Sequence, residues 1–143
     1  MSQLPPNPHP VPPRLVEPRY PMQSHIDFVL TGWGPGYARF EVDLQAFHMN
    51  RHGKLHGGVY AIVLDSAMGF SGAYTGDPED RILTMTLSMT TNFLAPAEGP
   101  RLVGEGWRTG GGRRTFFTEG RMTDGTGRLV ATATGTFQAR PWE

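Results

Sequence analysis

The residue best suited by its type and position to take part in a chemical reaction is Asp65, which lies inside an otherwise apolar stretch. Apolar residues recur at helical spacing through residues 59–70, a pattern that predicts a buried helix. A carboxylate in a buried helix is costly unless something holds it or uses it. Asp65 is therefore a candidate general base or nucleophile. The structural alternative is that it caps a loop or pairs with a buried arginine.

Two glycines, Gly57 and Gly58, stand where this helix is expected to begin. A helix N-terminus presents unpaired backbone N–H groups and a partial positive charge. A glycine there lets a substrate carbonyl approach the backbone closely, because no Cβ is in the way. Either glycine could therefore stabilise an oxyanion in acyl transfer, in addition to making the turn into the helix.

Three histidines, His48, His52 and His56, recur every four residues, a spacing that resembles one face of a metal-binding helix. Gly53 interrupts the stretch, and no cysteine or well-spaced carboxylate completes a ligand set. Neither chemical role of Asp65 needs a metal. We therefore expect no metal and no other cofactor.

A late glycine run, 110–112, precedes Arg113 and Arg114 and resembles a loop that cradles phosphates. It has no Walker-type lysine and it precedes a predicted strand instead of a helix. A flexible hairpin turn is the structural alternative. Arginine binds phosphate with two hydrogen bonds, so both residues are candidate phosphate contacts.

Composition narrows the class of protein. The formal net charge is zero, which argues against nucleic acid or an anionic membrane as the main partner. No stretch approaches the roughly 18 apolar residues of a membrane span, and the first residues lack the order of a signal peptide. The chain has no cysteine, which excludes thiol catalysis and fits a cytoplasmic protein.

The expected organisation is an arm followed by one domain. Eight prolines fall within residues 1–22, which we interpret as a disordered or extended arm unable to form a helix or an interior strand. Residues 23–143 suit a single domain. Alternating patterns predict strands over 25–31, 37–44, 83–90, 102–107, 114–122 and 128–138, with the helix over 57–74. One apolar helix with a largely antiparallel sheet gives an α+β fold, with the sheet wrapped around the helix.

Several of these segments carry a family resemblance. Asn50, the run His56-Gly57-Gly58 and Asp65, followed by residues 84–87 and 92–97, resemble the hotdog acyl-CoA thioesterases. Within that family the chain is most similar to the PaaI-like, phenylacetate-pathway branch. Residues 124–131 and 135–137 of this chain also match the last part of that branch's pattern. The resemblance covers roughly residues 25–138.

The resemblance implies hydrolysis of an acyl-CoA thioester to a free acid and CoA. The family's catalytic carboxylate falls on Asp65 and its oxyanion-hole glycine on Gly57. The asparagine and histidine that help to place water and thioester fall on Asn50 and His56. A strand hydroxyl near the carboxylate falls best on Thr86, although Thr84, Ser88 and Thr90 compete for that role.

Helix geometry constrains how such a site could be assembled. Gly57 and Asp65 are eight residues apart, roughly 12 Å along a helix. One helix cannot easily bring both groups to the same small reacting centre. We therefore expect a homodimer with two equivalent sites at a two-fold interface, in agreement with the resemblance. Further pairing into a homotetramer is common in the resembled family.

Two other functions remain open from the sequence. A hotdog acyl-thioester dehydratase or hydratase would use a histidine–acid pair, which His56 and Asp65 could supply. A non-catalytic acyl-CoA-binding protein would bind its ligand without releasing a thiol. The thioesterase is favoured by the spacing of the His-Gly-Gly run. The pattern does not choose between aryl and medium-chain acyl groups.

Overall fold

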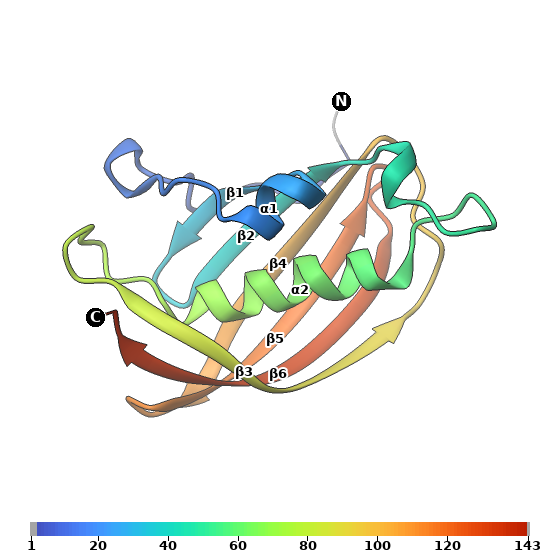
Figure 1. Cartoon of the computed structure of the whole chain (residues 1–143). Coiled ribbons are helices and arrows are strands. Elements are labelled where there is room, and N and C mark those ends of the chain that lie inside the picture. Colours follow the sequence, from blue (N-terminus) through green and yellow to red (C-terminus); the bar gives the residue numbers. More distant parts are fainter. Residues whose placement is uncertain (1–2, 143) are drawn as a thin grey trace.

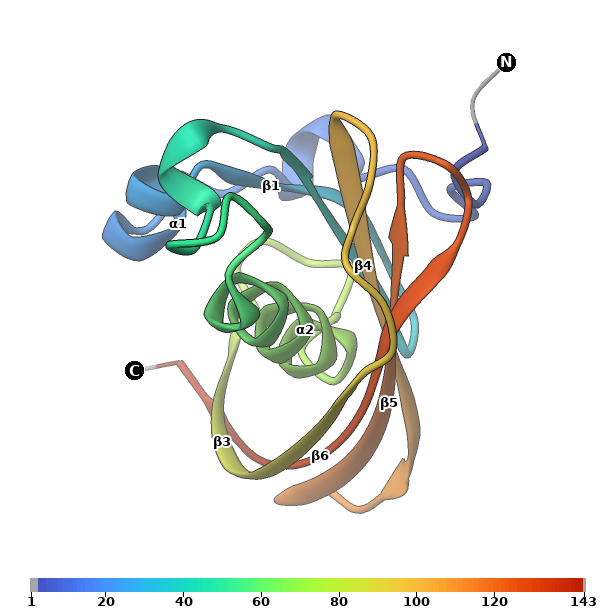
Figure 2. The ribbon, with the colours of Figure 1, turned by 90° about the vertical axis from the view of Figure 1, so that its right-hand side faces the viewer.

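The computed structural model describes residues 3–142. Residues 1 and 2 of the predicted arm and residue 143 of the predicted domain therefore lie outside the described part. One antiparallel sheet, in the order β1-β2-β4-β5-β6-β3, wraps around the central helix α2 (Figures 1 and 2). This confirms the α+β hotdog class expected from the sequence. No helix between residues 3 and 142 is long and apolar enough to cross a membrane. The elements are η1 (Pro13–Leu15), α1 (Pro21–Ile26), β1 (Phe28–Gly34), β2 (Tyr37–Asp43), η2 (Ala46–His48), α2 (Gly57–Ser71), β3 (Ile82–Phe93), β4 (Arg101–Gly111), β5 (Thr115–Asp124) and β6 (Leu129–Pro141).

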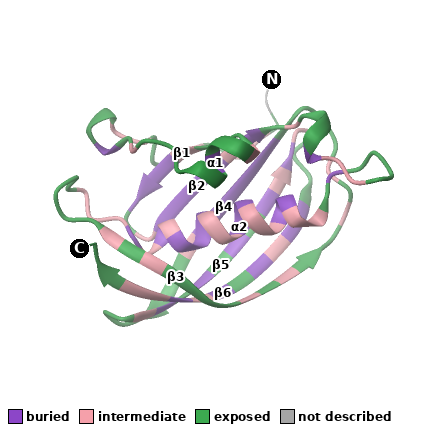
Figure 3. Cartoon of the chain, viewed as in Figure 1, coloured by how far each residue is buried: buried purple, intermediate pink, exposed green. Residues whose placement is uncertain are grey.

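The core lies between the concave face of the sheet and one side of α2. Val63, Leu64, Ala67 and Met68 of the helix are fully buried, and burial is concentrated on the strands that face them (Figure 3). The opposite side of α2, which carries Asp65, is only half-buried. The sequence predicted a buried helix. In a single chain, α2 is fully buried only on the side that faces the sheet.

Glycines on the strands allow α2 to lie unusually close to the sheet. A Cβ on Gly106 would lie 2.4 Å from the backbone carbon and oxygen of Ala67. Because backbone cannot move aside as a flexible side chain can, only glycine fits at this crossing. The close approach fixes where α2, and with it Asp65, stands over the sheet.

Gly106→Ala should therefore destabilise the fold, by about 1–3 kcal/mol as overpacking typically does. Urea unfolding followed by circular dichroism would measure the change in the free energy of unfolding. Gly110→Ala is the matched control, because it lies on the same strand and a Cβ there would meet nothing within 4 Å. Equal stability of the two variants would contradict the close-packing argument.

The proline-rich arm is ordered against the domain. His9 and Val11 form backbone hydrogen bonds with Trp33 and Thr31 of β1, and Leu15 is buried. Contrary to the expectation that the arm forms no helix, α1 begins at Pro21. Proline is well tolerated at the first position of a helix, where its missing N–H would have no partner.

Two predicted boundaries were wrong around the first strands. The strand expected over 25–31 begins at Phe28, because α1 continues to Ile26 and Asp27 caps it in the left-handed conformation. The predicted end at residue 31 is too early, because the glycine-containing segment 32–34 belongs to β1 and pairs with β2. The turn is therefore shorter than its glycine content suggested.

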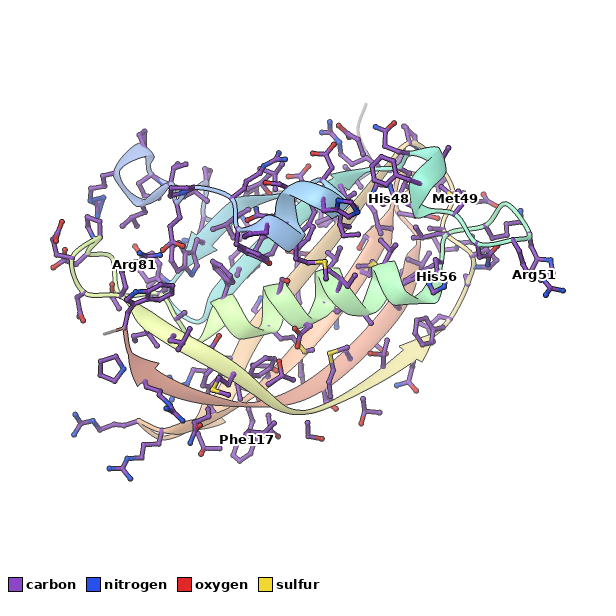
Figure 4. All side chains as sticks on the ribbon, viewed as in Figure 1. His48, Met49, Arg51, His56, Arg81 and Phe117 are labelled. Atoms are coloured by element: carbon purple, nitrogen blue, oxygen red, sulfur yellow. The ribbon has the colours of Figure 1, made fainter. Side chains whose placement is uncertain are left out.

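A shift of register divides the polar residues of β3 between the two faces of the sheet. The β3–β6 register shifts between Thr86 and Ser88, so the side chains exchange faces at Leu87. Thr86 reaches α2, whereas Ser88 lines a cavity beside Phe117. Figure 4 shows Phe117 on the face of the sheet away from α2 (Figure 4). The polar residues of this strand thus do not form one continuous face.

The turn after β5 is organised by a fully buried carboxylate, that of Asp124. It accepts hydrogen bonds from the backbone N–H groups of Glu98, Thr126 and Arg128 and from the Thr126 hydroxyl. Burial alone would raise the pKa of Asp124, but these hydrogen bonds outweigh it and lower the pKa. The ionised form is therefore the one that stabilises the fold.

Asp124→Asn should accordingly reduce the free energy of unfolding at neutral pH by about 1–3 kcal/mol. The native pKa is depressed, so the contribution is present above the ordinary aspartate pKa of about 3.9 and is lost as pH falls through the lower native value. Denaturant titrations between pH 3 and 8 would measure it. A stability difference that stays constant down to the lowest pH would argue against a role for the charge.

Candidate active site

The predicted carboxylate and hydroxyl meet. The Thr86 hydroxyl donates a hydrogen bond of 2.6 Å to Oδ1 of Asp65. In the described part of the chain, no other group is hydrogen-bonded to this carboxylate, so Oδ2 remains available to a water or a thioester. Asp65 makes no ion pair with residues 3–142. The structural alternative of a buried arginine partner or a loop cap is therefore not what this chain shows.

The start of α2 offers a backbone donor, as the glycines predicted. His56 is the N-cap, and its Nδ1 accepts a hydrogen bond of 2.8 Å from the Gly58 N–H. The Gly57 N–H donates to no acceptor among residues 3–142. Of the two glycines, only Gly57 thus presents a free N–H group at the positive end of the helix dipole.

The cap also determines how His56 can act. Because Nδ1 accepts the hydrogen bond from Gly58, the neutral imidazole carries its proton on Nε2. The His56 side chain is exposed and stands at the beginning of α2 (Figure 4). It can therefore donate from Nε2 to a substrate oxygen without giving up its capping role.

Asn50 shapes the loop before the helix. Its side-chain oxygen accepts hydrogen bonds from the backbone N–H groups of His52 and Lys54. Its own backbone N–H donates to the Lys54 carbonyl at 2.7 Å. These contacts close the loop tightly, so Asn50 has a structural role in the turn in addition to the role that the resemblance implies. The Asn50 amide nitrogen makes no hydrogen bond within the described part of the chain.

His48 has a structural role. It is 1% exposed, its Nδ1 accepts from the Gln45 N–H, and its Nε2 lies 2.6 Å from the Ile26 carbonyl. Within residues 3–142, no group of three or more potential ligands is placed to hold a metal ion. The four-residue spacing of the histidines does not place them on one helix, because His48 ends η2, His52 lies in the following loop and His56 caps α2.

Sequence reasoning missed one residue near Asp65. Tyr20, from the arm, lies over α2 with its hydroxyl 3.2 Å from that of Ser66, the next residue after Asp65. Burial is the main cause of the raised pKa of Tyr20, and the negative charge of Asp65 also raises it. Only the tertiary fold brings these residues together, since a tyrosine between prolines carries no local signal of such a contact.

A single chain does not bring the candidate site residues together. The carboxylate and the free Gly57 N–H are about 12 Å apart along α2, by the rise of a helix. His56 and Asp65 form no ion pair or hydrogen bond in the described chain. Arg113 and Arg114 lie elsewhere, on a cavity that also includes Gly72 just beyond the other end of α2.

The comparisons with known proteins agree on a family. A model of the thioesterase superfamily matches residues 52–131. A thioesterase family protein from Silicibacter pomeroyi is similar in structure, with 27% identity, a TM-score of 0.75 and coverage of 86% of this chain and 91% of that one. A search of curated protein sequences found no match.

Two PaaI proteins share the fold at lower identity. The Escherichia coli protein from the phenylacetic acid degradation operon has 17% identity and a TM-score of 0.71, with 82% of each chain covered. A mutant phenylacetic acid degradation protein PaaI from Thermus thermophilus has 23% identity and a TM-score of 0.71, with 83% of this chain and 98% of that one covered. With the family model matching more than half of its length, the chain belongs to the thioesterase superfamily.

Proposed function

We propose that this protein is a PaaI-like acyl-CoA thioesterase that releases a free acid and CoA. The observation that carries the proposal is the Asp65 carboxylate, held by Thr86 on one oxygen and unbound on the other. Thioester hydrolysis needs a base or nucleophile and a donor for the oxyanion. Asp65 supplies the first, either by activating water or by attacking the carbonyl to form a mixed anhydride.

The oxyanion donor in this proposal is the Gly57 N–H of a second subunit. A backbone donor at a helix N-terminus stabilises developing negative charge without having to reorganise during the reaction. His56 immediately precedes it and Asn50 lies in the loop before the helix, and in this proposal Nε2 of His56 and the amide nitrogen of Asn50 help to hold the thioester carbonyl or the water. The Gly58 N–H is already bound to His56, so Gly58 contributes close approach of the substrate instead of a donor.

The two edges of the sheet support dimerisation along β3. The β1 edge is covered by the arm through the Pro10–Gly32 bridge. The β3 edge has no strand beside it in residues 3–142, and Met85 and Leu87 on it are 47% and 56% exposed. A long apolar edge strand favours pairing with another strand. A second copy pairing antiparallel there would satisfy two-fold symmetry and cover the open side of α2.

Further pairing of dimers into a tetramer is part of the same proposal. The outer face of the sheet carries Phe117, which is 49% exposed. Dimerisation along β3 would leave this outer face of the sheet free, so a second dimer could pack against it. An assembly measurement by sedimentation would separate dimers from tetramers.

The hydratase alternative is less well supported. It needs a histidine that is free to accept a proton from carbon, whereas Nδ1 of His56 already accepts the Gly58 N–H and Nε2 of the neutral ring carries the proton. The binding-protein alternative predicts saturable binding of acyl-CoA with no turnover. It also predicts that replacing the Asp65 carboxylate leaves binding unchanged.

The test is release of free CoA thiol from a panel of aryl and medium-chain acyl-CoAs. The proposal expects release from at least one of them, and the names of the two PaaI proteins make phenylacetyl-CoA the first choice. An enoyl-CoA substrate monitored for hydration provides the comparison. Hydration without thiol release would move the assignment to the hydratase, and binding without either reaction would move it to the binding protein.

A further inference from the structure

A cavity lies beneath the N-terminal arm. Its volume is about 130 Å³, and it is enclosed between the arm with α1, the strand β1 and Phe70 of α2. Most of its lining comes from residues 11–23, which precede the residues 52–131 that the family model matches. The cavity is therefore built largely by this chain's own N-terminal segment.

The walls of the cavity are mainly apolar, with Val11, Val29, Leu30 and Phe70 among them. Leu30 and Phe70 pack against both hydrophobic clusters of the chain, so the cavity lies between the main core and the smaller cluster under the arm. Protein interiors are close-packed and contain few voids larger than a water molecule. An apolar cavity of about 150 Å³ binds benzene, so this cavity has room for about one six-membered ring.

The polar groups of the lining leave one amide free. Its two charged residues are paired: Arg19 lies 2.8 Å from Asp27, and Glu17 lies 3.2 Å from Arg81. Gln23 is 7% exposed, and its side-chain amide has no hydrogen-bond partner in residues 3–142. A buried amide without a partner is unfavourable unless a ligand or a water completes it. The lining thus suits a neutral, mostly apolar group.

Tyr20 connects this cavity to the neighbourhood of Asp65. It lines the cavity, and its hydroxyl lies 3.2 Å from that of Ser66. Figure 2, which looks along α2, shows α1 on one side of the open face of the helix and β3 on the other (Figure 2). Phe70 is five helix positions from Asp65, about 7.5 Å, and its side chain leans back towards the helix start. A group a few carbons long therefore spans the distance from Asp65 to the cavity.

We propose that this cavity binds the far end of the acyl group, so that the arm sets the size of acyl group that the enzyme accepts. This inference rests on the proposed function and specifies its substrate class: acyl-CoAs whose acyl group has a neutral, apolar end about the size of one six-membered ring. An acetyl group ends before the cavity, and a long alkyl chain exceeds it. Tyr20 and Gln23 are then specificity-determining residues contributed by the N-terminal segment.

The first measurement compares two CoA thioethers, S-(2-phenylethyl)-CoA and S-methyl-CoA, which bind without being hydrolysed. Calorimetry with the full chain should show the phenylethyl compound binding roughly tenfold more tightly or better, as expected for burial of a ring. Leu30→Trp fills the cavity from β1 and should remove this preference while leaving the affinity for S-methyl-CoA unchanged. Gln23→Phe fills it from α1 and replaces Leu30→Trp if circular dichroism shows that the latter does not fold.

The matched control is Leu44→Trp. Leu44 is half-buried like Leu30 and packs against the same main core, but it lies outside the cavity. The same substitution there should disturb packing to a similar degree and keep the preference for the phenylethyl compound.

The second measurement is a gain of function, which a damaged fold does not produce. Leu30→Ala enlarges the cavity and should raise kcat/KM for decanoyl-CoA relative to phenylacetyl-CoA by roughly tenfold, since each methylene in an apolar pocket changes discrimination by about that factor or more. The value for acetyl-CoA should stay the same. Leu44→Ala is the control and should leave the dependence on acyl length as in the wild type.

Three results would each overturn the inference: equal affinity of the wild type for the two thioethers, equal loss of preference in Leu30→Trp and Leu44→Trp, or an unchanged length dependence in Leu30→Ala. Thiol release that continues in those cases would leave the proposed function standing. Tighter binding of the phenylethyl compound without hydrolysis of any thioester would support the cavity and refute the thioesterase.

Discussion

Asp65→Asn should lower kcat for thioester hydrolysis by about 10²- to 10⁴-fold, the usual contribution of a positioned acid–base group. Asparagine has nearly the same shape, and its carbonyl oxygen can still accept the Thr86 hydrogen bond seen at 2.6 Å. The substitution therefore removes the charge and the basicity while preserving the local packing. It should leave KM for the acyl-CoA within a few-fold of the wild-type value.

The measurement is free-thiol release under saturating substrate, with circular dichroism to establish that the fold is retained. Asp43→Asn is the matched control, because Asp43 is an exposed carboxylate paired with Arg101 at the end of β2. It should retain full activity. An Asp65→Asn enzyme as active as the control would remove Asp65 from the chemistry, whichever of its two routes is considered.

Gly57→Pro should lower kcat by about 10²- to 10³-fold, the loss expected when one oxyanion donor is removed. Proline deletes the N–H that is free in the described chain, and it is favoured at the first position of a helix. The preceding residue, His56, already has the extended conformation that proline requires, with φ −65° and ψ 134°. A Cβ at Gly57 would make only an ordinary contact with Phe93, at 3.5 Å.

Gly57→Ala separates the donor from the glycine itself. Alanine adds a Cβ in the same place and keeps the N–H group, so any loss in Gly57→Ala measures crowding of the substrate. The kinetic comparison of the two variants, with thermal unfolding to compare stability, isolates the backbone donor. If alanine and proline reduce kcat equally, the Gly57 N–H is not the oxyanion donor.

The sequence predicts those residues of the candidate site that stand out from their immediate neighbours in the chain. Asp65 is visible because it interrupts an apolar helix, and Gly57 because glycine marks a helix start. Thr86 could not be chosen from four hydroxyl residues by pattern, since the register shift after it decides which of them face α2. The structure gives Thr86 a hydrogen bond with Asp65 and places Ser88 on the other face of the sheet.

Contacts between distant segments could not be predicted in the same way. Tyr20 reaches Ser66 only because the arm folds back over α2. A cavity lined by Arg108, Arg113, Arg114 and Arg140 lies where the β4–β5 hairpin, the beginning of β3 and the end of β6 meet, and the sequence indicated only its segment with Arg113 and Arg114. The helical start at Pro21 was missed because proline content was interpreted as a bar to helix, although the first position tolerates it.

The central claim is that each active site combines Asp65 of one subunit with Gly57 of its partner, and mixing the two inactive variants tests it directly. Asp65→Asn and Gly57→Pro are unfolded together, refolded at equal concentrations and assayed for thiol release. Each mixed dimer then contains one site with both groups intact, so random pairing should restore about one quarter of the wild-type activity. Activity that stays at the level of the separate variants, with mixed dimers shown by differential tagging, would contradict a shared site and place the chemistry within one chain.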